Sequence, residues 1–175
     1  MKRLRNVTLL LLFALSLLSV IGLALPSTFK VTRVVRINNS AAGIFPSIGA
    51  IRNWPEWAGV NQKKDATVLY SFSGPDRGIG CTMVFDGEKI GNGTIVFTDS
   101  ERDHSVSFNA LLNDEKAEFH GVVLLEPKES GTDVSITITG DVGFHLANRY
   151  VILTMDQIIG SILQEDLESL KALTE

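Results

Sequence analysis

The side chains best suited to acid–base chemistry lie in two parts of this sequence. Glu118 and His120 stand two apart in an alternating segment, and a carboxylate beside an imidazole can pass a proton. Residues two apart share one face of a strand, and Phe119 takes the opposite, apolar face. We therefore expect this pair in solvent. Asp156 and Tyr150 lie on a long helical segment near the C-terminus, and they are the candidates for a catalytic group inside the fold.

Other reactive residue types have no spacing that indicates a site. The three histidines have no metal-binding spacing among themselves. Neither GIG (78–80) nor GNG (91–93) precedes a helical segment, so neither predicts a phosphate-binding loop. Cys81 is the only cysteine and alternates with apolar residues, which predicts an unreactive, inward-facing thiol. We therefore expect no metal and no cofactor.

Both tryptophans of the chain stand in RNWPEWAG (52–59), where Trp54 and Trp57 lie on either side of Pro55. An indole buries a large apolar area and usually finds a partner for its N–H group. We expect this corner to close the mouth of an apolar pocket, packed as core while also touching a ligand. The other candidate ligand-binding residues are apolar or aromatic side chains on the expected strands and C-terminal helix: Phe72, Met83, Phe85, Phe97, Phe108, Phe119, Tyr150 and Met155.

The segments that carry these side chains have the hydrophobic pattern of strands. Residues 29–37 alternate and are rich in β-branched side chains, which predicts a first strand. Polar or glycine-containing turns separate the later segments, so they are expected to form an antiparallel meander. An ordinary filled core would explain their apolar faces equally well. The six segments are 66–73, 79–86, 89–99, 104–112, 115–126 and 132–140.

Two further segments have helical spacing. Asn39 or Ser40 can cap a short helix, and Pro55 is expected to end it. Residues 144–175 repeat apolar side chains every three or four positions, which predicts one long helix. We expect its acidic residues, Asp166 among them, on the solvent side.

This order of elements predicts an α+β domain over residues 30–175. A curved antiparallel sheet of six or seven strands is expected to wrap one face of the C-terminal helix. Where such a sheet curves strongly, the space beneath the helix is wider than side chains can fill. The sequence therefore predicts an apolar pocket between sheet and helix.

Residues 1–29 have the pattern of a membrane segment. Residues 7–25 are uncharged and mostly apolar, and they follow Lys2, Arg3 and Arg5. Nineteen residues at a helical rise span roughly 28 Å, close to the ~30 Å hydrocarbon core of a bilayer. We expect an uncleaved anchor in the inner membrane, with the N-terminus inside and the domain on the extracytoplasmic side. A signal peptide cut after Ala24 is the alternative.

The charge balance narrows the class of partner. The chain has a net charge of −4, and without the three basic residues of its start it has 13 basic against 20 acidic residues. Nucleic acid and anionic lipid headgroups both require a basic surface. We therefore expect no nucleic acid partner, whereas an apolar small molecule is compatible with this composition.

Several longer motifs are similar to one known superfamily. VTRVVRINNSAAGIFPSIGAIRNWPEWAG (31–59) resembles the opening strand, helix and Trp-Pro-x-Trp corner of START-like (SRPBCC) helix-grip proteins. GIGCTMVFDGEKIGNGTIVFTDSE (78–101), LEPKESGTDVSITITGD (125–141) and DLESLKALTE (166–175) resemble the bacterial polyketide cyclase/dehydrase-like branch, and LPS (25–27) after an anchor resembles a membrane-anchored subgroup. The resemblance implies a helix-grip fold with an apolar cavity for lipids, polyketides or sterols.

Three functions follow as hypotheses. The first is a membrane-tethered module that binds a hydrophobic small molecule or lipid between sheet and helix. The second is a cyclase or dehydratase acting on a polyketide-like substrate, which requires a titratable group inside the pocket. The third is a protein-interaction domain without catalysis, in which the interior is simply filled. Activity as an enzyme is the less favoured expectation, because no catalytic residue set of a cyclase can be matched onto this sequence.

Overall fold

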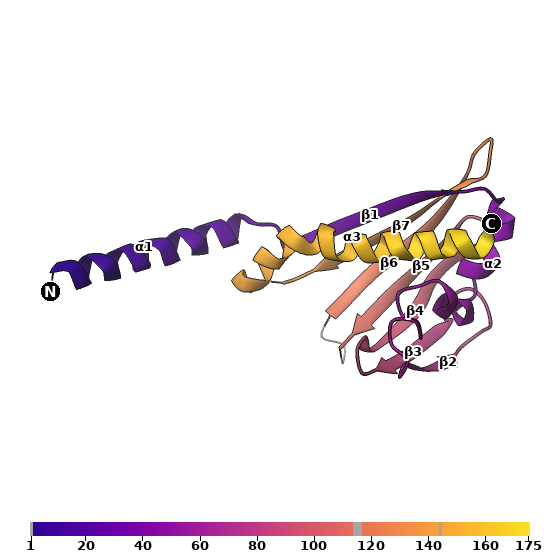
Figure 1. Ribbon diagram of the computed structural model, residues 1–175, viewed down its shortest axis with the longest axis horizontal. Coiled ribbons are helices and arrows are strands. Elements are labelled where there is room, and N and C mark those ends of the chain that lie inside the picture. The colour runs from indigo at the N-terminus through magenta and orange to yellow at the C-terminus, as the bar shows by residue number, and fades with distance from the viewer. Residues whose placement is uncertain (1, 114–116, 144) are drawn as a thin grey trace.

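The computed structural model describes residues 2–113, 117–143 and 145–175 (Figure 1). A long N-terminal helix projects from a domain in which the C-terminal helix crosses one curved sheet. In chain order, the elements are α1 (Lys2–Ala24), β1 (Thr28–Ile37), α2 (Ala41–Ile48), the 3-10 helix η1 (Ile51–Glu56), β2 (Leu69–Ser73), β3 (Thr82–Gly87), β4 (Gly91–Glu101), β5 (Ser105–Leu112), β6 (Ala117–Pro127), β7 (Thr132–Asp141) and α3 (Leu146–Thr174).

The seven strands form one sheet in the order β1-β7-β6-β5-β4-β3-β2, and every neighbouring pair is antiparallel. Strands β2 to β7 are the predicted meander, and the first strand pairs with the last. The predicted α+β architecture is therefore confirmed. Residues 114–116, which contain the start of the expected segment 115–126, and residue 144, the expected first residue of the last helix, lie outside the described residues.

One face of each central strand is buried, as the alternation predicts. On β5, Val106 and Phe108 are buried and alternate with partly exposed residues. On β3, Met83 and Phe85 are buried, whereas Val84 between them is 43% exposed. Because alternate side chains point to opposite sides of a sheet, these buried faces all belong to its concave side.

The short helix α2, which follows β1, ends earlier than expected. The Ser40 hydroxyl accepts a hydrogen bond from the Gly43 backbone N–H, so Ser40 caps α2 as predicted. However, α2 ends at Ile48, with Gly49 as its C-cap, and Pro55 lies inside η1 instead of ending the helix. The sequence pattern did not separate the two helices, because apolar spacing continues across the break.

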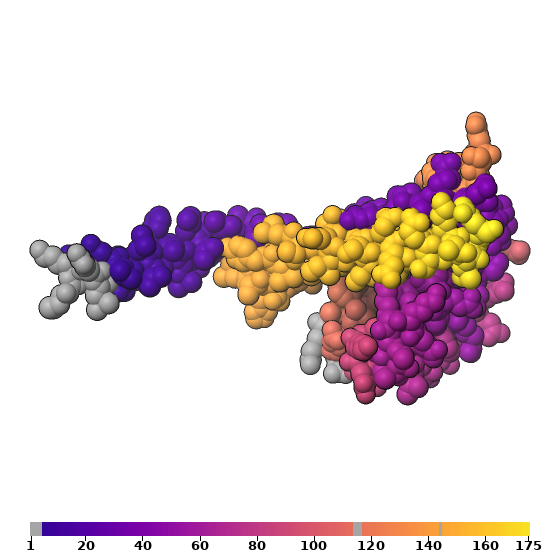
Figure 2. Space-filling view, in the orientation of Figure 1, coloured from indigo at the N-terminus to yellow at the C-terminus, as the bar shows by residue number. Residues whose placement is uncertain are grey.

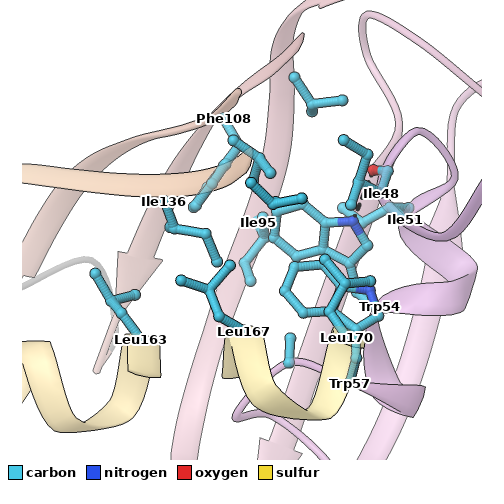
Figure 3. Packing of buried hydrophobic residues seen from close by; sticks show 14 of the residues in the cluster. Ile48, Ile51, Trp54, Trp57, Ile95, Phe108, Ile136, Leu163, Leu167 and Leu170 are labelled. Atoms are coloured by element: carbon cyan, nitrogen blue, oxygen red, sulfur yellow. Dashed lines mark hydrogen bonds between the residues drawn. The ribbon is translucent and has the colours of Figure 1, made fainter. Parts of the chain in front are cut away.

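The fully buried residues of α3 lie toward its C-terminal end. Leu163, Leu167 and Leu170 are buried and lie in the same cluster as the two tryptophans (Figure 3). Closer to the start of α3, Val151 and Leu153 are 43% and 67% exposed. The apolar spacing that predicts this helix therefore combines a buried stripe with an exposed one.

α1 lies outside the core and contacts the domain beside the start of α3 (Figure 2). Its segment Arg5–Ala24 has a mean hydropathy of 2.6, and it is the one helix of the described residues that is long and apolar enough to cross a membrane. A signal sequence meets the same criterion. The buried core runs from Phe29 to Leu170, so residues 25–175 contain the complete core of the described chain.

Candidate ligand-binding cavity

A cavity of about 500 Å³ lies between the concave face of the sheet, α3 and the segment that follows η1. Ligand pockets in proteins have volumes of roughly 300–1,000 Å³. Among the described residues, Lys64 and Asp166 are the two charged residues on its wall. The rest of the lining is apolar: Trp54, Trp57, Ala58, Gly59, Val60, Phe85, Ile90, Ile95, Phe108, Ala110, Leu112, Phe119, Val123, Ile136, Ile138, Ile159, Ile162 and Leu163.

The two tryptophans form a buried wall of this cavity (Figure 3). Trp54 and Trp57 are 3% and 2% exposed. Their indole N–H groups donate to the backbone oxygens of Ile48 and Ser47, at 2.9 and 3.0 Å. Trp54 also meets Phe108 edge to face, with ring centroids 4.9 Å apart. The corner therefore fixes the end of α2 to the sheet, and it does not close the mouth as the sequence led us to expect.

The mouth lies at the end of the sheet beside α1. Ile162 is 44% exposed, and Leu112 and Phe119 are partly exposed, although all three line the cavity. Phe119 pairs with Gly140 of β7, and Gly140 pairs with Phe29 at the start of β1, which directly follows α1. The tryptophans follow α2, which begins after the far end of β1. Mouth and tryptophan wall are therefore at opposite ends.

Glycines on the concave face let aromatic rings lie close against the strands. A Cβ atom at Gly121 would lie 2.1 Å from Cζ of Phe108, and one at Gly93 would lie 2.7 Å from Cζ of Phe85. Both rings line the cavity. Glycine within a strand is typical of such close approach. Because the rings occupy the space above these glycines, they take up less of the cavity.

Asp166 is the buried acidic group of the cavity. It is 8% exposed, although the sequence placed it on the solvent face of the helix. Burial raises the pKa of its carboxyl to about 7, and it outweighs a hydrogen bond from the Gly59 backbone and the charge of Lys64. Asp166 stands three residues after Leu163 and four before Leu170, so its spacing matched the buried stripe.

Asp65 is a second buried aspartate, beside the same segment of chain, and it is fully hydrogen-bonded. It is 1% exposed. Its carboxylate accepts hydrogen bonds from the N–H and hydroxyl of Thr67 and from the backbone N–H groups of Lys89 and Ile90. These donors hold the pKa of Asp65 well below its usual value. Asp65 thereby ties the segment after η1 to the hairpin between β3 and β4.

The two predicted catalytic candidates do not line the cavity. The Asp156 side chain is 73% exposed and lies 3.0 Å from Arg33, which lowers the pKa of the carboxyl. The Tyr150 hydroxyl donates to the backbone oxygen of Leu18 in α1. Both side chains have hydrogen-bond partners outside the cavity. They do not reach it because the first half of α3 extends past the cavity toward α1.

Apart from Tyr150, which bonds α1, the predicted ligand-binding residues divide into three groups. Trp54, Trp57, Phe85, Phe108 and Phe119 line the cavity. The Met83 and Phe97 side chains are buried in the core, away from the lining. Phe72 stacks on Tyr70 and lies under the Arg52 guanidinium, and Met155 packs at the edge of the core.

Glu118 and His120 are exposed, in agreement with the sequence. His120 Nδ1 lies 2.8 Å from the side-chain oxygen of Asn109 on the same outer face. Cys81 is buried, and burial raises the pKa of its thiol. Within the described ranges, no three His, Cys, Asp or Glu side chains gather closely enough to hold a metal ion.

Solved structures of several proteins share this architecture, whereas no protein-family model and no curated protein sequence matches the chain. The di-domain ARO/CYC StfQ from the steffimycin biosynthetic pathway aligns with a TM-score of 0.64 at 8% identity, over 84% of this chain and 50% of that one. Norcoclaurine synthase from Thalictrum flavum, in complex with dopamine and hydroxybenzaldehyde, aligns with a TM-score of 0.61 at 13% identity, over 87% and 90%.

The crystal structure of Ara h 8.0201 aligns with a TM-score of 0.60 at 9% identity, over 84% of this chain and 97% of that one. The chain thus spans about half of the di-domain proteins and nearly all of the single-domain ones. Identities this low establish the fold alone. The chain has the helix-grip fold of the START-like and Bet v 1-like proteins, and the fold expected from its motifs is confirmed.

Proposed function

We propose that this domain binds an apolar small molecule or a lipid in its cavity and performs no reaction on it. The cavity is the observation that carries the proposal, because it combines a volume of about 500 Å³ with a lining that is almost entirely apolar. A fold that buried its core only for stability would fill such a space, since interiors are normally close-packed. The structure of norcoclaurine synthase in complex with dopamine and hydroxybenzaldehyde supports the binding of small molecules by a helix-grip fold.

We further propose that α1 remains attached and tethers the domain to a membrane. The Arg149 guanidinium donates to the backbone oxygens of Leu23 and Leu25, both at 3.0 Å. The Tyr150 hydroxyl donates to Leu18 in the same helix. These bonds hold the last turns of α1 against the start of α3. They favour an anchor over a cleaved signal, because cleavage after Ala24 would remove two of these acceptors.

The tether places the mouth of the cavity beside the bilayer. Lys2, Arg3 and Arg5 at the start of α1 favour a cytoplasmic N-terminus, with the domain on the extracytoplasmic side of an inner membrane. The mouth is at the α1 end of the sheet, and Val151 and Leu153 expose apolar surface there. A lipid or other membrane-dissolved molecule would then reach the cavity by a short path.

Fluorescence titration with N-phenyl-1-naphthylamine, an uncharged apolar dye, tests the binding function. Residues 25–175 of the wild type are expected to bind the dye at micromolar concentration. Ala110→Phe adds a ring inside the cavity, so its affinity is expected to fall about 10-fold or more. Ala172→Phe makes the same change at an exposed position of α3 and should bind like the wild type. Absence of dye binding by the folded wild type would contradict the proposal.

A cyclase or dehydratase activity is the second candidate, and Asp166 is the observation that favours it. This carboxyl lies inside the cavity with a pKa raised to about 7, which suits a general acid or base. Chemical change of a ligand by the wild type, and its absence with Asp166→Asn, would support this candidate. The protein-interaction hypothesis required a filled interior, and the cavity weighs against it.

A further inference from the structure

The Asp166 carboxylate has fewer hydrogen-bond donors than a buried carboxylate can accept. An ionised carboxylate has about four acceptor sites. The Gly59 backbone N–H is the donor that the described residues give to Asp166. Lys64 stands beside it, but its ammonium lies 2.9 Å from the Glu165 carboxylate, which is 61% exposed. Most of the acceptor capacity of Asp166 is therefore free on the cavity wall.

Asp65 shows that this fold can satisfy a buried carboxylate completely. Two N–H groups bond one oxygen of Asp65, and the N–H and hydroxyl of Thr67 bond the other. An aspartate that only joined the segment after η1 to α3 would require similar donors, because an unsatisfied buried acceptor is costly. Asp166 joins this segment to α3 through one hydrogen bond, from the Gly59 backbone N–H. The remaining acceptor sites point to a ligand.

We infer that Asp166 is the polar anchor of the cavity and accepts a hydrogen bond from the hydroxyl group of an otherwise apolar alcohol or phenol. The inference rests on the proposed function, and it adds the chemical class of the ligand. The apolar lining holds the body of the molecule. The buried carboxylate orients the hydroxyl group between α3 and the segment that carries Gly59 and Lys64.

The charges around Asp166 favour a neutral hydroxyl group over a carboxylate or an ammonium group as its ligand. A carboxylate ligand would place a second negative charge beside Asp166, with Lys64 already paired to Glu165. An ammonium ligand would lose its hydration in an apolar cavity, and the loss of hydration of a buried ion pair can exceed the attraction between its two charges. A neutral hydroxyl group donates one hydrogen bond to an ionised oxygen without either penalty, and such charge-assisted bonds are stronger than neutral ones.

Displacement of N-phenyl-1-naphthylamine by matched ten-carbon compounds tests the inference on residues 25–175. 1-Decanol can donate a hydrogen bond, 2-decanone can only accept one, and decanoic acid is an anion. At alkaline pH the wild type is expected to bind 1-decanol about 10-fold more tightly than 2-decanone, as one charge-assisted hydrogen bond allows. Decanoic acid should be the weakest of the three.

Asp166→Asn keeps an acceptor for Gly59 but offers an amide N–H to the ligand, so the preference for 1-decanol over 2-decanone is expected to fall below about 2-fold. Glu168→Gln removes an exposed carboxylate from the same helix and should keep the wild-type ratio. Equal binding of alcohol and ketone by the wild type would overturn the inference while leaving the proposed function intact. Failure of the folded wild type to bind the dye would instead contradict the proposed function.

The pH dependence of the wild type gives a test that requires no substitution. Lys64 and Glu165 are the charged groups beside Asp166, and the sheet presents apolar side chains to it. With a pKa of about 7, the Asp166 carboxyl is protonated at lower pH and then donates a hydrogen bond to a ketone. The ratio of alcohol to ketone affinity should fall as the pH is lowered from about 8.5 to about 5.5. A ratio that does not change would overturn the inference.

Discussion

The two buried aspartates of this domain show how neighbouring donors decide the behaviour of a carboxylate. Asp65 accepts four hydrogen bonds, which favour its ionised form and hold its pKa well below the usual value. Asp166 lies in an apolar cavity with one backbone donor, so its neutral form is favoured and its pKa is raised to about 7. The stability of the domain should therefore respond to pH with opposite sign at the two positions.

Asp166→Asn is expected to stabilise the domain by about 1–3 kcal/mol near pH 8. A raised pKa in the folded state means that the wild type loses stability as the pH rises from the usual aspartate value through about 7, whereas asparagine does not titrate. The gain should therefore shrink toward pH 4. Urea unfolding of residues 25–175 across this range measures it.

Asp65→Asn provides the matched comparison. It is expected to destabilise the domain at neutral pH, and the loss should shrink as the pH falls, because the ionised form of Asp65 is the stabilising one. A difference that is independent of pH at both positions would show that neither carboxyl has a perturbed pKa.

At the residue scale, the sequence predicted apolar positions better than polar ones. Phe85, Phe108 and Phe119 line the cavity as expected, because alternation assigns a strand residue to one face. Asp156 was a candidate for the cavity and is exposed, whereas Asp166 was expected in solvent and is buried. Charge was taken as a sign that Asp166 is exposed, and helical spacing does not show which acid lies over the open part of the sheet.

At the element scale, the positions of two aromatic rings on the sheet depend on glycines in the neighbouring strands, which leave room for the rings. Gly121 lies under the Phe108 ring, and a side chain there would meet the ring at 2.1 Å. The ring belongs to the cavity wall, so its position sets part of the free volume. A glycine in the middle of β6 therefore keeps the Phe108 ring close to the sheet and the cavity open, although glycine weakens a strand.

Gly121→Ala is expected to push the Phe108 ring into the cavity. The domain should lose about 1–3 kcal/mol of stability, as in other overpacked cores, and bind N-phenyl-1-naphthylamine less tightly. Thermal unfolding and dye titration on residues 25–175 measure the two effects. Val122→Ala, on the exposed face of the same strand, should leave the affinity unchanged. Unaltered dye affinity in a folded Gly121→Ala domain would show that the ring does not limit the cavity.

The strands and the final helix could be predicted because their hydrophobic periods are long and regular. The six segments of the meander and α3 appear where the sequence placed them, with shifted ends. The division between α2 and η1 could not be predicted. Apolar residues continue at helical spacing through Ile51, and the pattern carries no signal for the break at Gly49, where the Phe45 ring occupies the place that a side chain would take.

At the scale of the whole molecule, α1 and the start of α3 form one joined end. Arg149 and Tyr150 bond the last turns of α1, and the mouth of the cavity lies at the same end of the sheet. If α1 spans a bilayer, this end faces the lipid and the tryptophan wall faces away. The exposed apolar side chains of the first half of α3 would then lie at the membrane surface.

Quenching of a fluorescent label by nitroxide lipids tests this orientation on the full chain in liposomes. Val151→Cys and Leu173→Cys place a bimane label on the same helix at positions of nearly equal exposure, 43% and 44%. They are about 33 Å apart along the helix at 1.5 Å per residue. The label at 151 is expected to be quenched several-fold more strongly. Equal quenching, or stronger quenching at 173, would contradict a mouth that faces the membrane.

The sequence predicted an apolar segment and a pocket, but it could not place one relative to the other. The mouth lies at the same end as α1 because β1, which follows α1, pairs with β7 beside Phe119, and the hydrophobic pattern does not encode this pairing. The cavity volume also depends on sheet curvature, which alternation does not encode.

The measurement that tests the central claim most directly is mass spectrometry of residues 25–175, purified from the native host and examined under native conditions and after organic extraction. We expect a stoichiometric apolar adduct that carries a hydroxyl group, and we expect Ala110→Phe to lose it. A folded wild-type domain with the mass of the bare chain, and no apolar compound in its extract, would contradict a ligand-binding cavity.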